Sequence, residues 1–190
     1  MFIHCFMAAI FKHSLVRFMG LHSHPMSESF NIPTIGDRKS KYEQLIPQLK
    51  GLFYGEKNFL ANCANAMAAI HYTFQFHWTG CYFVDGTELV LGPFQGPVAC
   101  TRIGLGKGVC GTAWQNQSTI IVADVELFPG HIACSPFSKS EIVVPLKNIK
   151  GEVFGVLDID SSHLNDFDET DQQYLELIVG LLMDLRENEK

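Results

Sequence analysis

The chain has 190 residues, of which 47% are hydrophobic and 18% are charged, and its formal net charge is −6 at pH 7. This length suits one ordinary domain, and the composition is typical of a folded globular protein and not of a disordered one. The acidic balance disfavours a nucleic-acid-binding protein, which carries a basic face, and the lack of an apolar run of about 18 residues disfavours a membrane-spanning helix.

Residues 1–25 differ in composition from the rest of the chain. They hold two basic residues and four histidines, and no acidic residue occurs before Glu28. Three interpretations stay open for this segment: a dispensable start ahead of Met26, an organellar targeting peptide, or ordered structure. We expect residues 26–190 to form the domain and treat residues 1–25 as an extra N-terminal segment.

Two helices are predicted in the first part of the domain. Between residues 40 and 55 apolar side chains recur at helical spacing, and Pro47 lies in the middle, where a proline either kinks a helix or marks its first turn. The Ala-rich residues 58–72 form a second helical pattern. Cys63 lies on its apolar stripe, so this thiol is expected to pack in the core.

Six strands are predicted after these helices, from β-branched runs separated by turn residues. They cover residues 80–84, 88–91, 97–103, 118–123, 141–147 and 152–160. Asp85 and Gly86 form a strong turn signal, and a second turn is predicted over residues 148–151. The strands on either side of each turn are therefore expected to form hairpins.

A closing helix is predicted after Thr170, because Thr170 and Gln173 match a capping box and apolar residues follow at helical spacing. Strands grouped together, with helices at both ends, favour an α+β fold with a central antiparallel sheet of about six strands and helices packed on it. Residues 101–139 are rich in loops, and long loops on a rigid sheet are where functional residues concentrate.

The run from Gly106 to Gly111 matches the glycine pattern of dinucleotide-binding proteins, and Asp124 follows where a ribose-binding acid would lie. The preceding strand is weak, however, and the helix that could follow has only about six residues, about half the length that a crossover helix needs. We therefore expect these glycines to form a tight loop that places Cys110, with Trp114 packed in the short turn after it.

Three of the six cysteines, Cys100, Cys110 and Cys134, lie in or beside the loop-rich middle. Scattered cysteines without a CxxC pair, in a chain of this length, indicate a reducing compartment and not a secreted disulfide scaffold. The residues alone leave reactive thiols, packing thiols and a metal site that includes His131 as open interpretations. Only His131 and Cys134 have close ligand spacing, so we predict no metal.

Acidic and aromatic side chains gather on the predicted strands. Asp158 and Asp160 are two positions apart on one strand and thus point to the same face, and Glu141 begins the neighbouring strand. These carboxylates are either solvated at a wet strand end, or they bind an ammonium group or supply a proton. Trp78 and Tyr82 flank the first strand and belong either to the core or to a pocket wall.

Several motifs resemble one known family, the free methionine-(R)-sulfoxide reductases, whose fold is a single GAF domain. The similar stretches are WTGCYF (78–83), GPVAC (96–100), GLGKGVCGTAW (104–114), VELFPGHIACS (125–135), SEIVVPL (140–146) and GVLDIDS (155–161). The resemblance spans about residues 40–185, and the spacing of the three loop cysteines is particular to this group.

The resemblance implies a role for each cysteine and a reaction. Cys134 is implied as the catalytic cysteine, Cys100 as the cysteine that forms a disulfide with it, and Cys110 as a third cysteine in disulfide exchange. The implied reaction reduces free L-methionine-(R)-sulfoxide to L-methionine and leaves Cys134 as a sulfenic acid. Thioredoxin, supplied with electrons from NADPH, is the implied reductant, and no metal or organic cofactor is expected.

The resemblance also implies the substrate contacts. Glu141, Asp158 and Asp160 are implied to hold the substrate ammonium group and to assist at the sulfoxide oxygen, with Trp78 and Tyr82 as pocket walls. We expect a cytoplasmic protein, compatible with a homodimer, without nucleic-acid or membrane partners. The alternatives are a GAF domain that senses a small ligand, or a redox sensor without turnover, and the cysteine triplet is not needed for ligand sensing.

Overall fold

The computed structural model describes residues 30–31 and 35–187. Its elements are α1 (Arg38–Phe53), α2 (Phe59–Phe74), β1 (Trp78–Asp85), β2 (Glu88–Gln95), β3 (Arg102–Gly104), α3 (Gly108–Asn116), β4 (Ile120–Val122), the 3-10 turn η1 (Val125–Leu127), β5 (Ser140–Lys147), β6 (Val153–Ser161) and α4 (Glu169–Glu187). Residues 1–25 lie outside the described residues, so the boundary at residue 26 stays a prediction.

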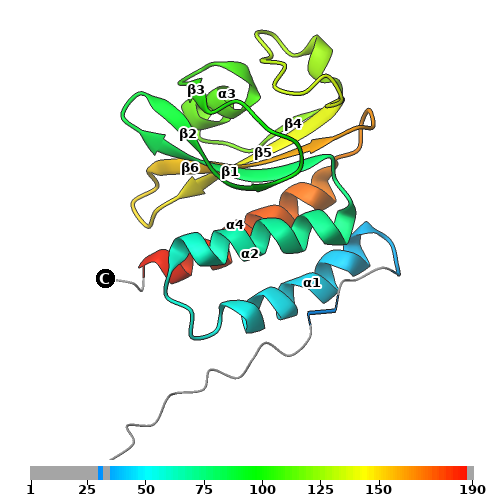
Figure 1. The fold of residues 1–190 in the computed structure, drawn as a ribbon, viewed down its shortest axis with the longest axis vertical. Coiled ribbons are helices and arrows are strands. Elements are labelled where there is room, and N and C mark those ends of the chain that lie inside the picture. The colour runs from blue at the N-terminus through cyan, green and yellow to red at the C-terminus, as the bar shows by residue number, and fades with distance from the viewer. Residues whose placement is uncertain (1–29, 32–34, 188–190) are drawn as a thin grey trace, which may run out of the picture.

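The strands form a six-stranded sheet in the order β3-β2-β1-β6-β5-β4, and all neighbours are antiparallel. Figure 1 shows α1, α2 and α4 on one face of this sheet, with α3 and the longer loops on the other. The predicted α+β fold is thereby confirmed. Both predicted hairpins are present, and Gly86 has a φ of 64°, which suits a tight turn between Asp85 and Glu88.

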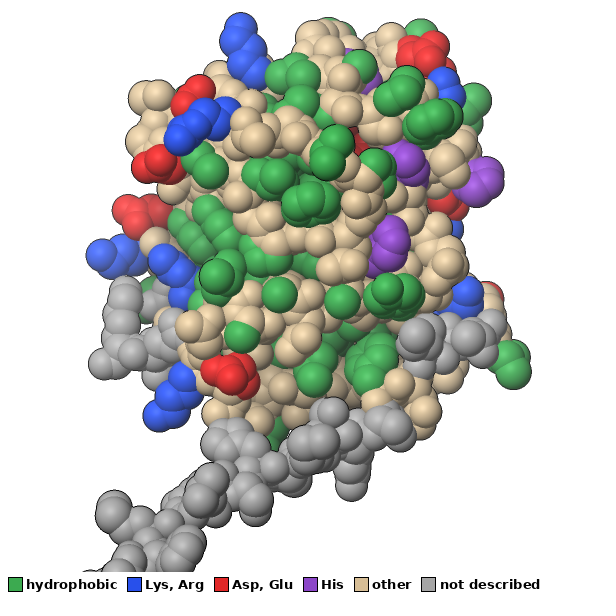
Figure 2. Space-filling model, in the orientation of Figure 1, with side chains coloured by type: hydrophobic (Ala, Val, Ile, Leu, Met, Phe, Trp, Pro, Cys, Tyr) green, Lys and Arg blue, Asp and Glu red, His purple; other side chains and the backbone are tan. Residues whose placement is uncertain are grey.

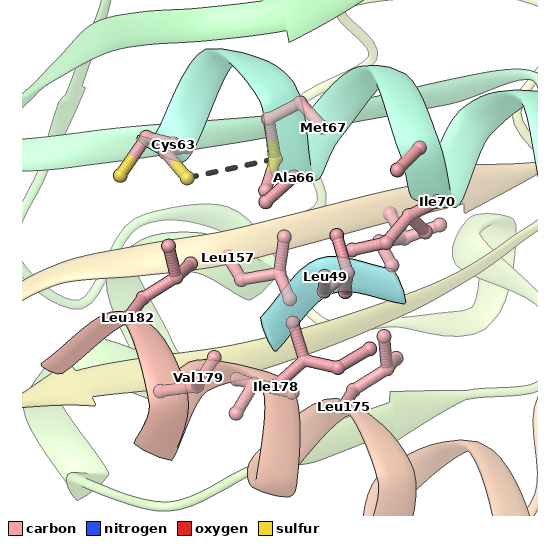
Figure 3. Packing of buried hydrophobic residues seen from close by; sticks show 14 of the residues in the cluster. Leu49, Cys63, Ala66, Met67, Ile70, Leu157, Leu175, Ile178, Val179 and Leu182 are labelled. Atoms are coloured by element: carbon pink, nitrogen blue, oxygen red, sulfur yellow. Dashed lines mark hydrogen bonds between the residues drawn. The ribbon is translucent and has the colours of Figure 1, made fainter. Parts of the chain in front are cut away.

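The main core lies between the sheet and the three helices α1, α2 and α4. Figure 3 shows side chains of these helices and of β6 pointing toward one another, among them Leu49, Met67, Leu157 and Ile178. Cys63 is fully buried in this core, as its position on the apolar stripe predicts. Each such aliphatic side chain contributes about 1.5–3 kcal/mol when fully buried, so this face supplies most of the fold's stability.

The helix starts follow local side-chain caps. Asp37 accepts a hydrogen bond from the backbone N–H of Ser40 at 2.8 Å, and Asn58 caps α2 through the N–H of Ala61 at 2.9 Å. Pro47 lies inside α1 and does not start it. None of the helices in the described part of the chain is long and apolar enough to cross a membrane.

The predicted capping box of Thr170 and Gln173 is wrong by two residues. Asp168 accepts from the N–H of Thr170 at 2.7 Å, and Asp171 accepts from the N–H of Asp168 at 3.1 Å. Two carboxylates thus cap α4. They satisfy free N–H groups as a hydroxyl would, and their negative charge is favoured at a helix N-terminus.

The predicted strand over residues 97–103 is mostly a loop. Only β3, at residues 102–104, is a strand there, and β2 continues instead to Gln95, which pairs with Thr79 of β1. Pro97 has no N–H to give to a ladder, and its carbonyl accepts from the Trp78 indole at 3.1 Å. The strand predicted at 118–123 is likewise shorter and covers residues 120–122.

The helix α3 has nine residues, where about six were expected, and it contains both Cys110 and Trp114. The expectation that Trp114 lies in a turn is therefore wrong. The glycines do form the tight entry to this helix: Gly106 and Gly108 have φ values of 71° and 58°, and Gly111 lies against the Gly104 carbonyl without room for a side chain. An antiparallel sheet has no place for a dinucleotide-binding crossover.

Candidate active site

A pocket opens on the face of the sheet that carries α3. Its walls come from β1, β5 and β6, from the start of α3, and from the loops before β3 and β5. Seven of the eight predicted site residues line it, namely Trp78, Tyr82, Cys110, Cys134, Glu141, Asp158 and Asp160. The eighth, Cys100, reaches the same place through its bond to Cys134.

Cys100 and Cys134 form a disulfide, and their Cα atoms lie 5.5 Å apart. This is the pair that the resemblance implies. Both residues are half-buried, so the bond lies at the mouth of the pocket and not in the core. The zinc set of Cys100, Cys110, His131 and Cys134 does not form in this structure, because two of its thiols are joined to each other.

The three carboxylates meet because of the register of the β5–β6 hairpin. Glu141 pairs with Asp160, and Asp158 pairs with Val143, so all three side chains point to the α3 side of the sheet. Glu141 and Asp158 are each only 6% exposed. This burial rules out the solvated strand end that the residues alone left open.

Burial and mutual repulsion raise the pKa of these carboxyl groups. For Glu141 burial is the main cause, followed by the charges of Asp158 and Asp160; for Asp158 it is burial, followed by the charge of Asp160. Burial raises the pKa of Asp160 to about 6. Among the described residues no Lys or Arg forms an ion pair with them, and Asp158 Oδ1 has no hydrogen-bond partner. The site thus suits a cationic ligand.

The Cys110 thiol faces this acidic group from the first turn of α3. Its Sγ lies 3.9 Å from Glu141 Oε1, and burial, followed by the charges of Asp158 and Glu141, raises its pKa. Cys110 is therefore a neutral thiol in this form. A metal ion could also be bound here, because three possible ligand atoms, one each from Cys110, Glu141 and Asp158, lie within 4.8 Å of one another. Sequence reasoning did not propose that set.

The two predicted aromatic residues form one wall. The Trp78 indole stacks on Tyr82 with ring centroids 5.8 Å apart, and it lies over Gly80, where a side chain would collide with the ring. The Tyr82 hydroxyl donates to the Cys100 carbonyl at 3.0 Å. Burial raises the pKa of Tyr82, so it stays a neutral donor. Both rings are buried, and both also face the pocket.

Sequence reasoning missed four polar residues of the site. Lys107 and His131 line the pocket, and Ser135 and Ser138 follow Cys134 in the same loop. Burial is the larger effect and raises the pKa of Asp160, and a hydrogen bond from Ser138 offsets part of this rise. Closeness in sequence to Cys110 or Cys134 was the available signal for all four residues. The sequence had suggested His131 only as a metal ligand.

Several known proteins are similar to this chain in sequence and fold. The GAF domain model matches residues 56–185. The GAF domain-containing protein A of Dictyostelium discoideum is 57% identical over 158 residues, which are 83% of this chain and 99% of that protein. The free methionine-R-sulfoxide reductase of Saccharomyces cerevisiae is 43% identical over 148 residues, 74% of this chain and 82% of that protein.

A solved structure of one such reductase is also similar to this chain in sequence and fold. The free methionine-R-sulfoxide reductase of Neisseria meningitidis, in complex with its substrate, is 44% identical and superimposes with a TM-score of 0.82. The match covers 86% of this chain and 98% of that one. The chain therefore belongs to the GAF domain family and, within it, to the free methionine-R-sulfoxide reductases, which are oxidoreductases.

Proposed function

We propose that this protein reduces free L-methionine-(R)-sulfoxide to L-methionine through cysteine chemistry. The single observation that carries the proposal is a reducible cysteine, Cys134, at the mouth of a pocket lined by three buried carboxyl groups without a cationic partner among the described residues. The membership of the family supports the same reaction, since relatives bear this name and one was solved with its substrate.

The proposed substrate is a free amino acid because the pocket matches both of its charges. The ammonium group is held by Asp158 and Asp160, which have no counter-ion from Lys or Arg in the described part of the chain. No side chain caps the start of α3, so its first backbone N–H groups are available for the substrate carboxylate. A methionine within a peptide carries neither charge.

The proposed reaction begins with proton donation. A sulfoxide sulfur is a poor electrophile until its oxygen is protonated, and Glu141, whose pKa burial raises, can supply that proton. The Cys134 thiolate attacks the sulfur, the oxygen passes to Cys134 as a sulfenic acid, and methionine leaves. Trp78 and Tyr82 bound the apolar side of the pocket, where the methyl group fits.

Recycling follows through a second thiol. Cys100 attacks the sulfenic sulfur, water leaves, and the Cys100–Cys134 disulfide forms. Cys110 is a buried neutral thiol in this form, which supports Cys100 as the first partner and a later exchange role for Cys110. Thioredoxin then reduces the disulfide, so the proposed cycle needs neither a metal nor an organic cofactor. We also propose a cytoplasmic location, which the scattered cysteines favour, and a homodimer, which the resemblance to the family favours.

A thioredoxin-coupled assay of NADPH oxidation tests this function. We expect turnover with free L-methionine-(R)-sulfoxide, much weaker turnover with the N-acetylated sulfoxide, and none with Cys134→Ser. N-acetylation removes the ammonium charge and leaves the carboxylate and the sulfoxide unchanged, so it is the control for substrate choice. No turnover by the fully reduced wild type would contradict the proposal and favour a GAF sensor, whose Cys134 would react with peroxide and ignore the amino acid.

A further inference from the structure

We propose that His77 is a positioning residue that keeps Cys134 over the pocket whenever the Cys100–Cys134 disulfide is open. The inference rests on the proposed function, which requires Cys134 to be free of Cys100 when it attacks. The main observation behind the inference is a hydrogen bond between His77 Nε2 and Ser135 Oγ, 2.9 Å long, beside the reactive cysteine.

Cys134 lies in a loop with few anchors, formed by residues 129–138. This loop contains no helix or strand, and in Figure 1 it projects beside the sheet before β5. Its polar or covalent side-chain links to the rest of the described chain are the disulfide, the Ser135 bond to His77, and the Ser138 bond to Asp160 at the loop's end. Only the first two hold its centre.

His77 is a rigid anchor because it directly precedes β1. That strand is paired on both sides, with β2 and with β6. The imidazole also contacts the Phe137 ring edge-on, with centroids 6.0 Å apart, so it touches the loop on both sides of Pro136. In Figure 2 histidine side chains (purple) gather on the side of the molecule where this loop lies.

His77 acts through Ser135 and not on the substrate. It is absent from the pocket lining, whereas Ser135 and Cys134 both belong to it. Ser135 directly follows Cys134, so fixing its hydroxyl also limits where the Cys134 sulfur can move. A displacement of about 1 Å is enough to slow a reaction that needs aligned atoms.

The anchor matters in one redox state only. In the oxidised chain the bond to Cys100 holds Cys134, and loss of the hydrogen bond changes little. After reduction that tether is gone, and among the described residues the His77–Ser135 bond is the remaining polar side-chain link at the centre of the loop, beside apolar contacts of Ile132 and Phe137. A purely structural histidine would matter equally in both states.

Hydrogen exchange of residues 129–138, measured on the oxidised and the reduced full chain, tests this directly. We expect His77→Ala to speed exchange of the loop in the reduced protein and to leave it unchanged in the oxidised one. His77→Gln, whose amide nitrogen reaches as far as Nε2, is expected to restore the wild-type pattern. His163→Gln, after β6, is the matched control, because its exposed side chain bonds Ser161 and does not line the pocket, and it is expected to change neither.

Kinetics supply the second readout. We expect His77→Ala to lower kcat about fivefold with little change in KM, and Ser135→Ala to add little to it in the double variant, as for two partners of one hydrogen bond. Equal exchange in both redox states, additive effects, or an active wild type indifferent to His77→Ala would overturn the inference. An inactive wild type would count against the proposed function, while the exchange experiment would still decide the role of His77.

Discussion

The two faces of the sheet have different roles, although the same strands form both: one face packs against the helical core and the other lines the pocket. On β6, Leu157 and Ile159 point into the core under the helices, while Asp158 and Asp160 point into the pocket. On β1, Cys81 faces the core and Tyr82 the pocket. The two-residue period of a strand thus sends the helix-side core and the acidic site to opposite faces, although the pocket face also has buried apolar residues such as Val143 and Val156.

The cysteines show the same division. Cys63 and Cys81 are fully buried on the helix side, where Cys81 donates to the Met67 sulfur at 3.6 Å. Cys100 and Cys134 are half-buried on the pocket side and are joined to each other. The face of the sheet does not by itself make a thiol reactive, because Cys110 lies on the pocket face and is buried; what distinguishes Cys100 and Cys134 is that they also have access to solvent.

The largest expected effect concerns the proton donor on the pocket face. Glu141→Gln keeps the shape but cannot donate a proton from a carboxyl group. We expect kcat to fall about 100-fold or more, as when a general acid is lost, with thermal stability retained. Steady-state rates and a melting curve of the same sample check this, and an unchanged kcat would remove Glu141 from the proposed mechanism.

A substitution in the core is expected to lower stability and to leave kcat nearly unchanged. Leu157→Ala, one residue from Asp158, leaves a cavity beneath the sheet and should cost about 2–5 kcal/mol of unfolding free energy. Urea unfolding measures this loss. The kcat of the folded fraction should stay near the wild-type value, and a large drop in kcat at 10 °C would show that the two faces are coupled.

Asp160→Asn is expected to weaken substrate binding and to stabilise the fold. Removing one negative charge from the ammonium site should raise KM about tenfold for the free substrate, the size expected when one charged hydrogen bond is lost. An unchanged KM would mean that the ammonium group binds elsewhere.

The expected effect of Asp160→Asn on the stability of the fold depends on pH. Folding raises the pKa of Asp160 from 3.8 to about 6, so the folded chain binds more protons than the unfolded chain between these values. Stability contributed by this group is therefore present below pH 3.8 and lost as the pH rises to about 6. Asn does not titrate, so melting curves should show a higher Tm for Asp160→Asn at pH 7 and a flatter pH profile. A lower Tm at pH 7 would contradict this.

The smallest expected effect is that of a core thiol. Cys63→Ala should cost about 1 kcal/mol of stability and leave turnover unchanged, because this thiol lies in the core, beside Cys81 and away from the pocket. Urea unfolding and the coupled assay check both halves. The turnover of Cys134→Ser, which is expected to be lost, then provides the comparison between a thiol on the pocket face and a thiol on the core face.

Local patterns made much of this predictable. Alternation and the turn at residues 148–151 were enough to bring Glu141, Asp158 and Asp160 to one face, since register in a hairpin follows from the turn. The family motifs implied the Cys100–Cys134 pair. The contact between His77, before β1, and Ser135 was not predictable, because no local rule relates two residues so far apart along the chain.

The errors have the same origin. Residues 97–101 have strand-like composition, yet the Pro97 carbonyl and the Cys100 carbonyl are bound by Trp78 and Tyr82 of β1, so these residues wrap the pocket and do not extend the sheet. The α4 cap moved to Asp168 because Asp171, which returns the cap bond, is also held by Tyr42 and Arg38 of α1. Tertiary contacts decided both.

A single-turnover experiment tests the central claim, that Cys134 on the pocket face carries the chemistry. Fully reduced protein is mixed with excess free L-methionine-(R)-sulfoxide in the absence of thioredoxin. We expect release of about one methionine per chain, with Cys100 and Cys134 joined in the product and a trappable sulfenic acid on Cys134 in Cys100→Ser. Methionine release by Cys134→Ser, or none by the wild type, would contradict the account.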